Sequence, residues 1–237
     1  MQKLEQSEME KLAGLPVPTL SATLYAMGYT NCFLAGLSPV DLQSAHFVGT
    51  AYTMRALPAR PDILAGVTSG ALPNMHRQGL AQAGPGDVIV TDCGGDNRIS
   101  FFGELITTHL RVKGISAIVT DAGMADVIDV AATRLPVFCQ GSAPVPAPAR
   151  QIICDLQCPI ACMGVTIYPG DILVGDENGV VAIPRAIVTD VIAGSTQKEH
   201  LERFLLSRLK QGAPLDGTYP PNAEMLAEYE ASKTDDK

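Results

Sequence analysis

The 237-residue sequence predicts an α/β domain with a strand-rich core, and three observations support this prediction. Two octapeptides, Pro85–Asp92 and Pro169–Asp176, differ only at Thr91 against Gly175 when Val/Ile and Ile/Leu are treated as equivalent. Each has the pattern of a Pro-Gly turn followed by an apolar strand. The segment from Gly103 to Asp126 has the pattern of a helix, a strand and a loop, and elsewhere helices and strands mix without strict alternation.

The other elements follow from apolar spacing and from turn residues. Short helices are predicted over residues 19–27, 62–70, 76–83 and 104–112. A longer helix is predicted from Arg185 or Ala186 to Lys210, with a break near Gly194. Strands are predicted over residues 46–54, 115–120, 136–139, 164–168 and 180–183. The proline-rich residues 141–150 predict an extended loop, and residues 232–237 a frayed tail.

The segment from Gly103 to Asp126 is the best candidate for a functional site. The backbone N–H groups at the start of its helix have no intrahelical partner, so they offer a place for a substrate carboxylate. Glu104 at the helix start and Asp126 in the loop can face the same pocket and offer hard oxygen ligands to a divalent cation. On local sequence alone the simpler alternative is favoured, in which Glu104 only complements the helix dipole.

Composition excludes several functional classes. The net charge is −8, and no basic stripe is visible, which argues against a nucleic-acid surface. No stretch approaches the ~20 apolar residues of a membrane helix, and the polar N-terminus lacks the apolar core of a signal peptide. We therefore expect a cytoplasmic protein that binds neither nucleic acid nor membrane.

Cysteine and histidine residues do not predict a metal centre. The six cysteines include three at four-residue spacing, Cys154, Cys158 and Cys162, but no Cys-x-x-Cys pair. Buried thiols in a reducing compartment explain them better. No histidine pair has metal-ligand spacing, and each of the four is expected to be structural.

A family resemblance spans nearly the whole chain, from about residue 19 to residue 221. It rests on both Pro-Gly-Asp units, Gly-Gly-Asp-Asn-Arg, Phe-Gly-Glu-Leu, Gly-Ile-Ser-Ala-Ile-Val-Thr-Asp-Ala-Gly and Gly-Val-Val-Ala-Ile-Pro. In order and spacing these motifs resemble the RraA-like family, which includes class II 4-hydroxy-4-methyl-2-oxoglutarate/4-carboxy-4-hydroxy-2-oxoadipate aldolases and regulators of RNase E. The resemblance implies a swivelling β/β/α domain over residues 19–185, after an N-terminal segment of residues 1–18. It also implies trimers or hexamers with sites between subunits, with residues 186–237 packing on a neighbour.

The aldolase signature of this family is an acidic residue, twenty intervening residues and then Arg-Asp. The matching positions are Glu104, Ala125 and Asp126, so the spacing is kept while the arginine is replaced. By resemblance, Asp126 would ligate Mg²⁺ or Mn²⁺, and Glu104 would act as an acid/base relay. The pyruvyl carboxylate would bind at Gly103 and at the N–H groups of Leu105 and Ile106. Glu199, or otherwise Glu202, would reach this site from a neighbouring subunit.

The resemblance implies a metal-dependent lyase that acts on a 4-hydroxy-2-oxo acid or oxaloacetate and stabilises a pyruvate enolate on the metal. Three explanations of Ala125 stay open. Another cation can replace the arginine, with Arg98 nearest in sequence and Arg150, Arg77 and Lys113 more distant, although a structural ion pair is the simpler role for each. The pocket can have changed its substrate chemistry. Finally, the protein can act by binding alone, with an RNase E-type partner.

Overall fold

The computed structural model describes residues 4–235, and its centre is a mixed eight-stranded sheet. The strands lie in the order β1-β5-β4-β3-β2-β9-β10, and β6 also pairs with β2. Their bounds are β1 Ser38–Pro39, β2 Phe47–Pro58, β3 Asp87–Asp92, β4 Ala117–Thr120, β5 Val137–Cys139, β6 Gln151–Leu156, β9 Ile172–Asp176 and β10 Gly179–Ile183. A separate hairpin joins β7 Ile160–Cys162 and β8 Val165–Ile167.

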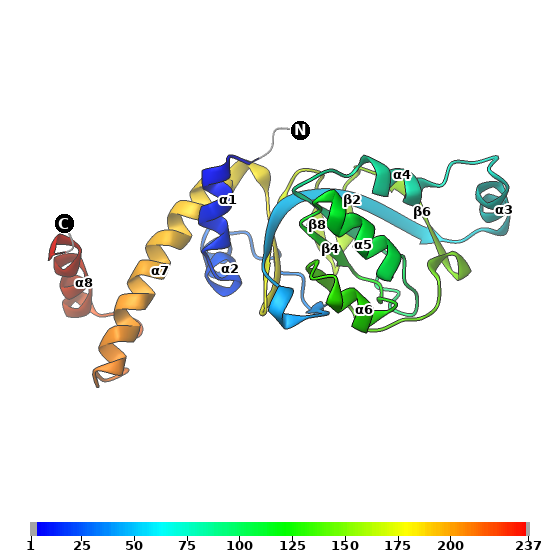
Figure 1. The fold of residues 1–237 in the computed structure, drawn as a ribbon. Helices are drawn as coiled ribbons and strands as arrows, with labels where there is room; N and C mark the ends of the chain where they lie inside the picture. The colour runs from blue at the N-terminus through cyan, green and yellow to red at the C-terminus, as the bar shows by residue number, and fades with distance from the viewer. Residues whose placement is uncertain (1–3, 236–237) are drawn as a thin grey trace.

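Helices pack at two places on this sheet (Figure 1). The first group lies beside the parallel strands and consists of α4 Met75–Gln82, α5 Glu104–Lys113 and α6 Val127–Ala132, with α3 Pro61–Ser69 beyond it. The second group lies at the β9–β10 end and consists of α1 Gln6–Ala13, α2 Val17–Ala26 and the start of α7 Val188–Lys210. The rest of α7 projects away from the sheet and carries α8 Ala223–Asp235 at its far end (Figure 1).

Strand β2 organises the domain because it pairs with three other strands. It runs parallel to β3, and the parallel order continues through β4 to β5. It runs antiparallel to β9 and β6. Strands β3 and β9 are the two matched Pro-Gly-Asp units, so the sequence repeat supplies the neighbours of β2 on both sides. The carboxyl ends of β3 and β4 therefore lie side by side, with Thr91 opposite Thr120.

The predicted fold class is confirmed, and most predicted elements are present within two or three residues of their bounds. Strand β2 continues to Pro58, four residues past the predicted end, because β6 pairs with residues 54–58 of β2. Helix α2 begins at Val17, two residues before the domain boundary predicted at residue 19. Three helices, α1, α6 and α8, were not predicted at all.

Two predictions at the C-terminal end are wrong. Helix α7 continues through Gly194 without a break, since the helix passes close to α2 there: a Cβ on Gly194 would lie 3.0 Å from Cγ2 of Thr23. The next residue, Ser195, is buried and shares a 2.9 Å hydroxyl hydrogen bond with Thr23. The glycine and serine permit a close helix contact. The tail is helical as far as Asp235, where we expected fraying, and residues 236–237 lie outside the described part.

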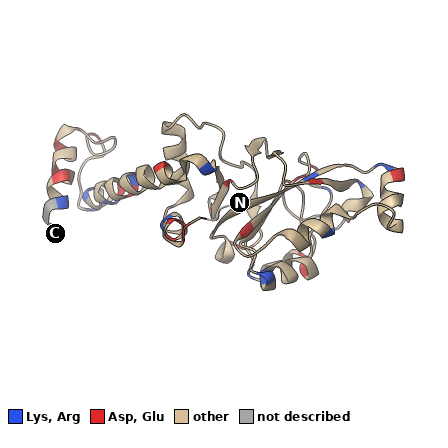
Figure 2. Cartoon of the chain, turned by 90° about the horizontal axis from the view of Figure 1, so that it is seen from above, with Lys and Arg blue, Asp and Glu red and all other residues tan. Residues whose placement is uncertain are grey.

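Charged side chains of both signs are interspersed along α7 and α8 (Figure 2). Several of them pair with each other, as Lys198 does with Glu202 and Arg208 with Glu228. No helix within residues 4–235 combines the length and the apolar character that spanning a bilayer requires.

Candidate functional site

The site is built on the first turn of α5. Gly103 is its N-cap in an extended conformation, Glu104 is its first residue, and Gly114 ends it in the left-handed region. The N–H groups of Leu105 and Ile106 belong to this first turn, where no carbonyl lies one turn back to accept them. Both donors are therefore available to an anion, at the positive end of the helix dipole.

Asp126 is held against this helix start. Its Oδ2 accepts a hydrogen bond of 3.2 Å from the N–H of Glu104. Asp126 is the N-cap of α6 and adopts φ 51° and ψ 42°, a left-handed conformation that Asp tolerates better than most residues. A Cβ at Gly103 would lie 2.6 Å from Oδ2 of Asp126, so glycine is what permits the carboxylate to approach so closely.

A buried serine fixes the two loops relative to each other. Oγ of Ser100 accepts hydrogen bonds of 3.1 Å from the N–H groups of Phe102 and Ala125, and it donates to the carbonyl of Phe102. The N–H of Ala125 also lies 3.3 Å from that carbonyl. Ser100 thus ties the residue before Gly103 to the residue before Asp126. Sequence reasoning missed Ser100, since a single serine between apolar residues carries no distinctive signal.

A cavity of about 600 Å³ opens in front of α5. The structure brings five of the predicted site residues together on its wall: Gly103, Glu104, Leu105, Ile106 and Asp126. The opposite wall comes from α4, through Arg77, Leu80 and Ala81, and His109 on α5 completes the lining. The cavity therefore combines two carboxylates, a helix start and one arginine.

Residues 17–182 match the RraA-like family, described as Aldolase/RraA, and this match covers more than half of the chain. The chain belongs to the RraA-like family. A relative from Halalkalibacterium halodurans, provisionally named a 4-hydroxy-4-methyl-2-oxoglutarate aldolase, is 34% identical over 120 residues, which is 51% of this chain and 57% of the relative. Protein DlpA of Legionella pneumophila is 26% identical over 208 residues, or 88% of this chain and 32% of DlpA. The chain thus spans less than two thirds of the length of these relatives.

Solved structures confirm the RraA-like fold. An uncharacterized protein from Pseudomonas syringae superposes with a TM-score of 0.79 at 24% identity, covering 92% of this chain and 100% of that one. RraAS2 of Streptomyces coelicolor, described as an unusual member of the RNase ES inhibitor RraA protein family, gives a TM-score of 0.77 at 24% identity, covering 86% and 98%. Such distant similarity establishes the fold alone.

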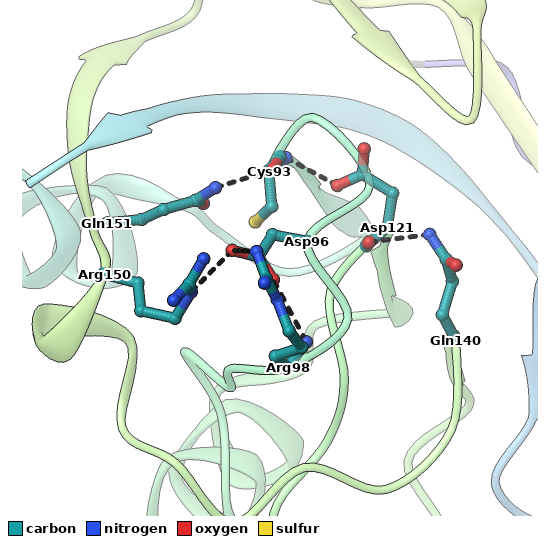
Figure 3. Close-up of polar contacts among 7 residues, drawn as sticks. All are labelled: Cys93, Asp96, Arg98, Asp121, Gln140, Arg150 and Gln151. Atoms are coloured by element: carbon teal, nitrogen blue, oxygen red, sulfur yellow. Dashed lines mark hydrogen bonds and ion pairs between the residues drawn. The ribbon is translucent and has the colours of Figure 1, made fainter.

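Three of the four cations considered for the missing arginine are engaged elsewhere in this RraA-like chain. Asp96 accepts hydrogen bonds from Arg98 at 2.7 and 3.0 Å and from Arg150 at 2.8 Å (Figure 3). Arg98 was predicted to bind substrate, but it is not part of the cavity wall. Its hydrogen bonds to Asp96, together with those of Arg150, hold the pKa of that carboxyl well below its usual range. Nζ of Lys113 donates to the carbonyls of Leu80 and Ala81 at 2.7 and 2.6 Å.

A buried carboxylate, also missed from the sequence, orders the loops that follow β3 and β4. Asp121 accepts hydrogen bonds from the N–H groups of Cys93 and Gly95 at 2.5 and 2.8 Å. Its carbonyl accepts from Gln140, and the carbonyl of Cys93 accepts from Gln151, each at 2.8 Å (Figure 3). Burial raises the pKa of Asp121. The available sequence signal is a Thr-Asp pair at the carboxyl end of each strand: Thr91-Asp92 closes β3, and in Thr120-Asp121 the threonine is the last residue of β4.

His76 anchors α4 beside the start of α5. Its ring packs edge-on against Phe101 and Phe102, with centroid distances of 5.3 and 5.6 Å. These are the two residues before Gly103. Burial lowers the pKa of His76 to about 4, so the ring is neutral near pH 7. The prediction that His76 is structural agrees with this packing.

The other predicted residues lie away from the cavity within one chain. Glu199 is on α7 and accepts hydrogen bonds of 3.0 Å from Thr19 and Arg203, while Glu202 pairs with Lys198. All six cysteines are free, and β6 and β7 replace any helix over residues 154–162. Among residues 4–235, no three His, Cys, Asp or Glu side chains converge as a metal site would require.

Proposed function

We propose that this protein is a divalent-metal-dependent lyase that cleaves a carbon–carbon bond of a 4-hydroxy-2-oxo acid or of oxaloacetate. The main support is the placement of the Asp126 carboxylate against the first turn of α5, at the wall of a 600 Å³ cavity. This arrangement sets a cation ligand beside free N–H donors, as recognition of a 2-oxo acid requires. Membership of the RraA-like family and the names of the aldolase relatives support the same reaction class.

The donor set fits Mg²⁺ or Mn²⁺. These ions prefer oxygen ligands, and Mg²⁺ commonly keeps several waters while binding one or two protein carboxylates. Asp126 is one such carboxylate and would ligate the ion, whereas Glu104 would stay free to accept a proton; both side chains are exposed to the cavity. A bound divalent ion supplies Lewis-acid polarisation of the substrate carbonyl.

The residues of the chain then divide the remaining work. The N–H groups of Leu105 and Ile106 bind the carboxylate next to the 2-oxo group, which fixes the orientation of the substrate. With a 4-hydroxy-2-oxo acid, the carboxylate of Glu104 takes the proton of the 4-hydroxyl group as the carbon–carbon bond breaks, and it returns that proton to the enolate carbon, which becomes the methyl group of pyruvate.

A noncatalytic binding function is the second candidate, and Ala125 is the observation that favours it. The methyl group of Ala125 cannot pair with developing negative charge as a guanidinium does, and losing one such donor typically costs ~10²–10³ in rate. RraAS2 of Streptomyces coelicolor is described as a member of an RNase ES inhibitor family. Under this alternative the partner is an RNase E-type protein, and the cavity turns over no 2-oxo acid.

The decisive experiment measures pyruvate release. The purified protein is assayed with 4-hydroxy-2-oxo acids and with oxaloacetate, with Mg²⁺, with Mn²⁺ and after treatment with EDTA. We expect release that EDTA abolishes and added metal restores. Ala125→Arg is expected to raise the rate if the missing guanidinium limits it. The absence of release under every metal condition would overturn the lyase and favour the binding function.

We further propose that the active assembly is a trimer or hexamer in which α7 and α8 pack on a neighbour. Helix α7 projects away from the sheet domain, which leaves much of its length uncovered in a single chain (Figure 1). Leu105 in the cavity wall and Ile128, two residues after Asp126, are 85% and 82% exposed, and a neighbouring subunit would cover these apolar side chains. Glu199 of one subunit would then complete the cavity of another, after exchange of its bonds to Thr19 and Arg203.

Mixed assemblies test this arrangement. Asp126→Ala and Glu199→Gln subunits are each inactive under the proposal, but a co-refolded mixture regains activity because some cavities receive one intact residue from each subunit. Glu202→Gln replaces Glu199→Gln in the control mixture. If Glu199→Gln is fully active alone, the proposed role of Glu199 is wrong.

A further inference from the structure

Arg77 carries an unpaired positive charge in the cavity wall. It lies in the first turn of α4, and within residues 4–235 its guanidinium forms no ion pair and no hydrogen bond with another side chain. The other arginines considered for this pocket, Arg98 and Arg150, are both paired with Asp96. A guanidinium presents five N–H donors in a planar fork that matches a carboxylate. Arg77 is therefore the side chain of this cavity best suited to bind an anion.

Contacts at both ends of α4 hold the backbone of Arg77 beside α5. At its start, His76 packs on Phe101 and Phe102, which places the first turn of α4 beside the first turn of α5. At its end, Lys113 of α5 donates two hydrogen bonds to the carbonyls of Leu80 and Ala81. The two helices thus run alongside each other, and the α4 wall holds Arg77 across the cavity from the N–H groups of α5.

Charge balance indicates which kind of group Arg77 can bind. Under the proposed function a divalent cation balances the two carboxylates of Glu104 and Asp126. The start of α5 receives the carboxylate next to the 2-oxo group. Arg77 is then the one full charge of the cavity wall that lacks a counterpart. The volume of about 600 Å³ lies within the range of pockets that bury much larger ligands than a three-carbon acid.

We propose that Arg77 is the specificity-determining residue that binds a second, distal carboxylate of the substrate, so that the cavity selects dicarboxylic 2-oxo acids over monocarboxylic ones. The inference rests on the proposed function for the placement of the first carboxylate. Arg77 takes no part in bond breaking. Its guanidinium positions the far end of the substrate through the distal carboxylate.

Two ligands of equal chain length isolate this contact. 2-Oxoglutarate carries the distal carboxylate and 2-oxopentanoate lacks it. Binding of each is measured by isothermal titration calorimetry in the presence of Mg²⁺, for the wild-type protein and for Arg77→Gln, Arg77→Lys and Arg111→Gln. Arg111 is a matched control, because it is an exposed arginine on α5 that does not line this cavity.

We expect wild-type protein to bind 2-oxoglutarate more tightly than 2-oxopentanoate. Arg77→Gln is expected to weaken binding of 2-oxoglutarate by about 10- to 100-fold, the usual value of a charge-assisted hydrogen bond, and to leave 2-oxopentanoate within about 2-fold. Arg77→Lys is expected to fall between, because lysine keeps the charge but loses the fork. Arg111→Gln is expected to bind both ligands with the affinities of the wild-type protein.

Three results would overturn the inference: no wild-type preference for the diacid, an equal loss of both ligands in Arg77→Gln, or a change in assembly mass in Arg77→Gln that makes Arg77 a subunit contact. Failure of the lyase itself looks different. In that case the selective loss of 2-oxoglutarate binding persists while no variant, and no wild-type protein, releases pyruvate.

Discussion

The cavity at Asp126 and the cluster around Asp96 both combine carboxylates with arginine, but they differ in how the charges are used. In the Asp96 cluster one carboxylate receives two guanidinium groups, and only 12% of its side chain is exposed (Figure 3). In the cavity Asp126 accepts one backbone hydrogen bond, from the N–H of Glu104, and the Arg77 guanidinium has no ion-pair partner among residues 4–235. The charges of the Asp96 cluster are paired with each other, whereas those of the cavity are left open to the solvent.

Under the proposed function, the Asp96 cluster contributes to stability and the cavity at Asp126 carries the chemistry. Charges that are already paired have little left to offer a substrate, and their removal is felt in folding. Charges held apart by the backbone cost stability and persist where function requires them. Predictions for the two regions therefore differ in kind as well as in size.

The largest effect is expected from Asp126→Ala. The substitution removes the one carboxylate that is fixed against α5, so we expect kcat/KM for pyruvate release to fall by on the order of 10²–10³. Affinity for Mn²⁺, followed by electron paramagnetic resonance, is expected to fall with it. Asp129→Ala, on the exposed face of α6, is the control and keeps both properties. Unchanged Mn²⁺ affinity in Asp126→Ala would remove the metal site from this position.

Acid pH is expected to lower the free energy of unfolding through His76, which packs beside the start of α5. The pKa of His76 is about 4 in the folded protein and near 6.5 when unfolded, so between these values the unfolded chain binds a proton that the folded chain does not. The free energy of unfolding therefore falls as pH decreases from about 6.5 to 4, by about 3 kcal/mol in total at most.

Urea unfolding across this pH range measures the effect of His76. His76→Phe keeps an aromatic ring beside Phe101 and cannot titrate, so the loss between pH 6.5 and 4 is expected to shrink. His200→Gln, on the exposed face of α7, is the control and is expected to lose as much stability between pH 6.5 and 4 as the wild type. Equal acid sensitivity in the His76→Phe and wild-type proteins would show that another group is responsible.

A smaller effect is expected from Gly103→Ala. The new methyl group would lie 2.6 Å from Oδ2 of Asp126, so the carboxylate must move away from the N–H of Glu104. Displacements of about 1 Å can cost up to 10²-fold in rate, and we expect about 10-fold here. Gly14→Ala is the control, since its nearest neighbours lie at an ordinary 3.6 Å or more. Full activity in Gly103→Ala would mean that the close approach is unnecessary.

Local parts of the cavity were predictable from the sequence. The start of α5 follows from Gly103 and Glu104, and its end from Gly114, because capping depends on adjacent residues. The fixed spacing to Asp126 spans one helix, one strand and one loop, a unit whose geometry varies little. The RraA-like fold was predictable for a similar reason, since its strand motifs occur in order along the chain.

Nonlocal parts were not predictable. Arg77 reaches the cavity because His76 packs on Phe101 and Lys113 bonds to the end of α4, and neither contact leaves a pattern in the sequence. Arg98 was favoured for its nearness in sequence, yet Asp96 two residues earlier captures it. Gly194 suggested a helix break because an isolated glycine lowers helix propensity, whereas packing on α2 reverses that preference.

The smallest effect is expected from the paired cluster, where Asp96→Asn leaves two guanidinium groups without a counter-charge. Because both arginines are substantially exposed, at 65% and 42%, solvent screens much of the loss, and we expect about 1 kcal/mol, or roughly 2–4 °C in Tm. Pyruvate release stays unchanged. Because the pKa of Asp96 is lowered in the folded protein, the carboxylate contributes fully to the free energy of unfolding at pH values above its ordinary pKa of about 3.8. This contribution is lost only as pH falls below that value, which is beneath the range in which His76 acts.

Calorimetric scans of Asp96→Asn at pH 7 and pH 3 separate these windows. The Tm of Asp96→Asn is expected to lie below that of the wild type at pH 7, and this difference in Tm is expected to narrow at pH 3. Asp62→Asn is the control: its pair with Arg60 is exposed on both sides, so little change in Tm is expected at pH 7. If Asp96→Asn instead abolishes pyruvate release without a change in Tm, the Asp96 cluster takes part in the chemistry. The division between a paired, stabilising cluster and an unpaired, functional cavity is then wrong for this fold.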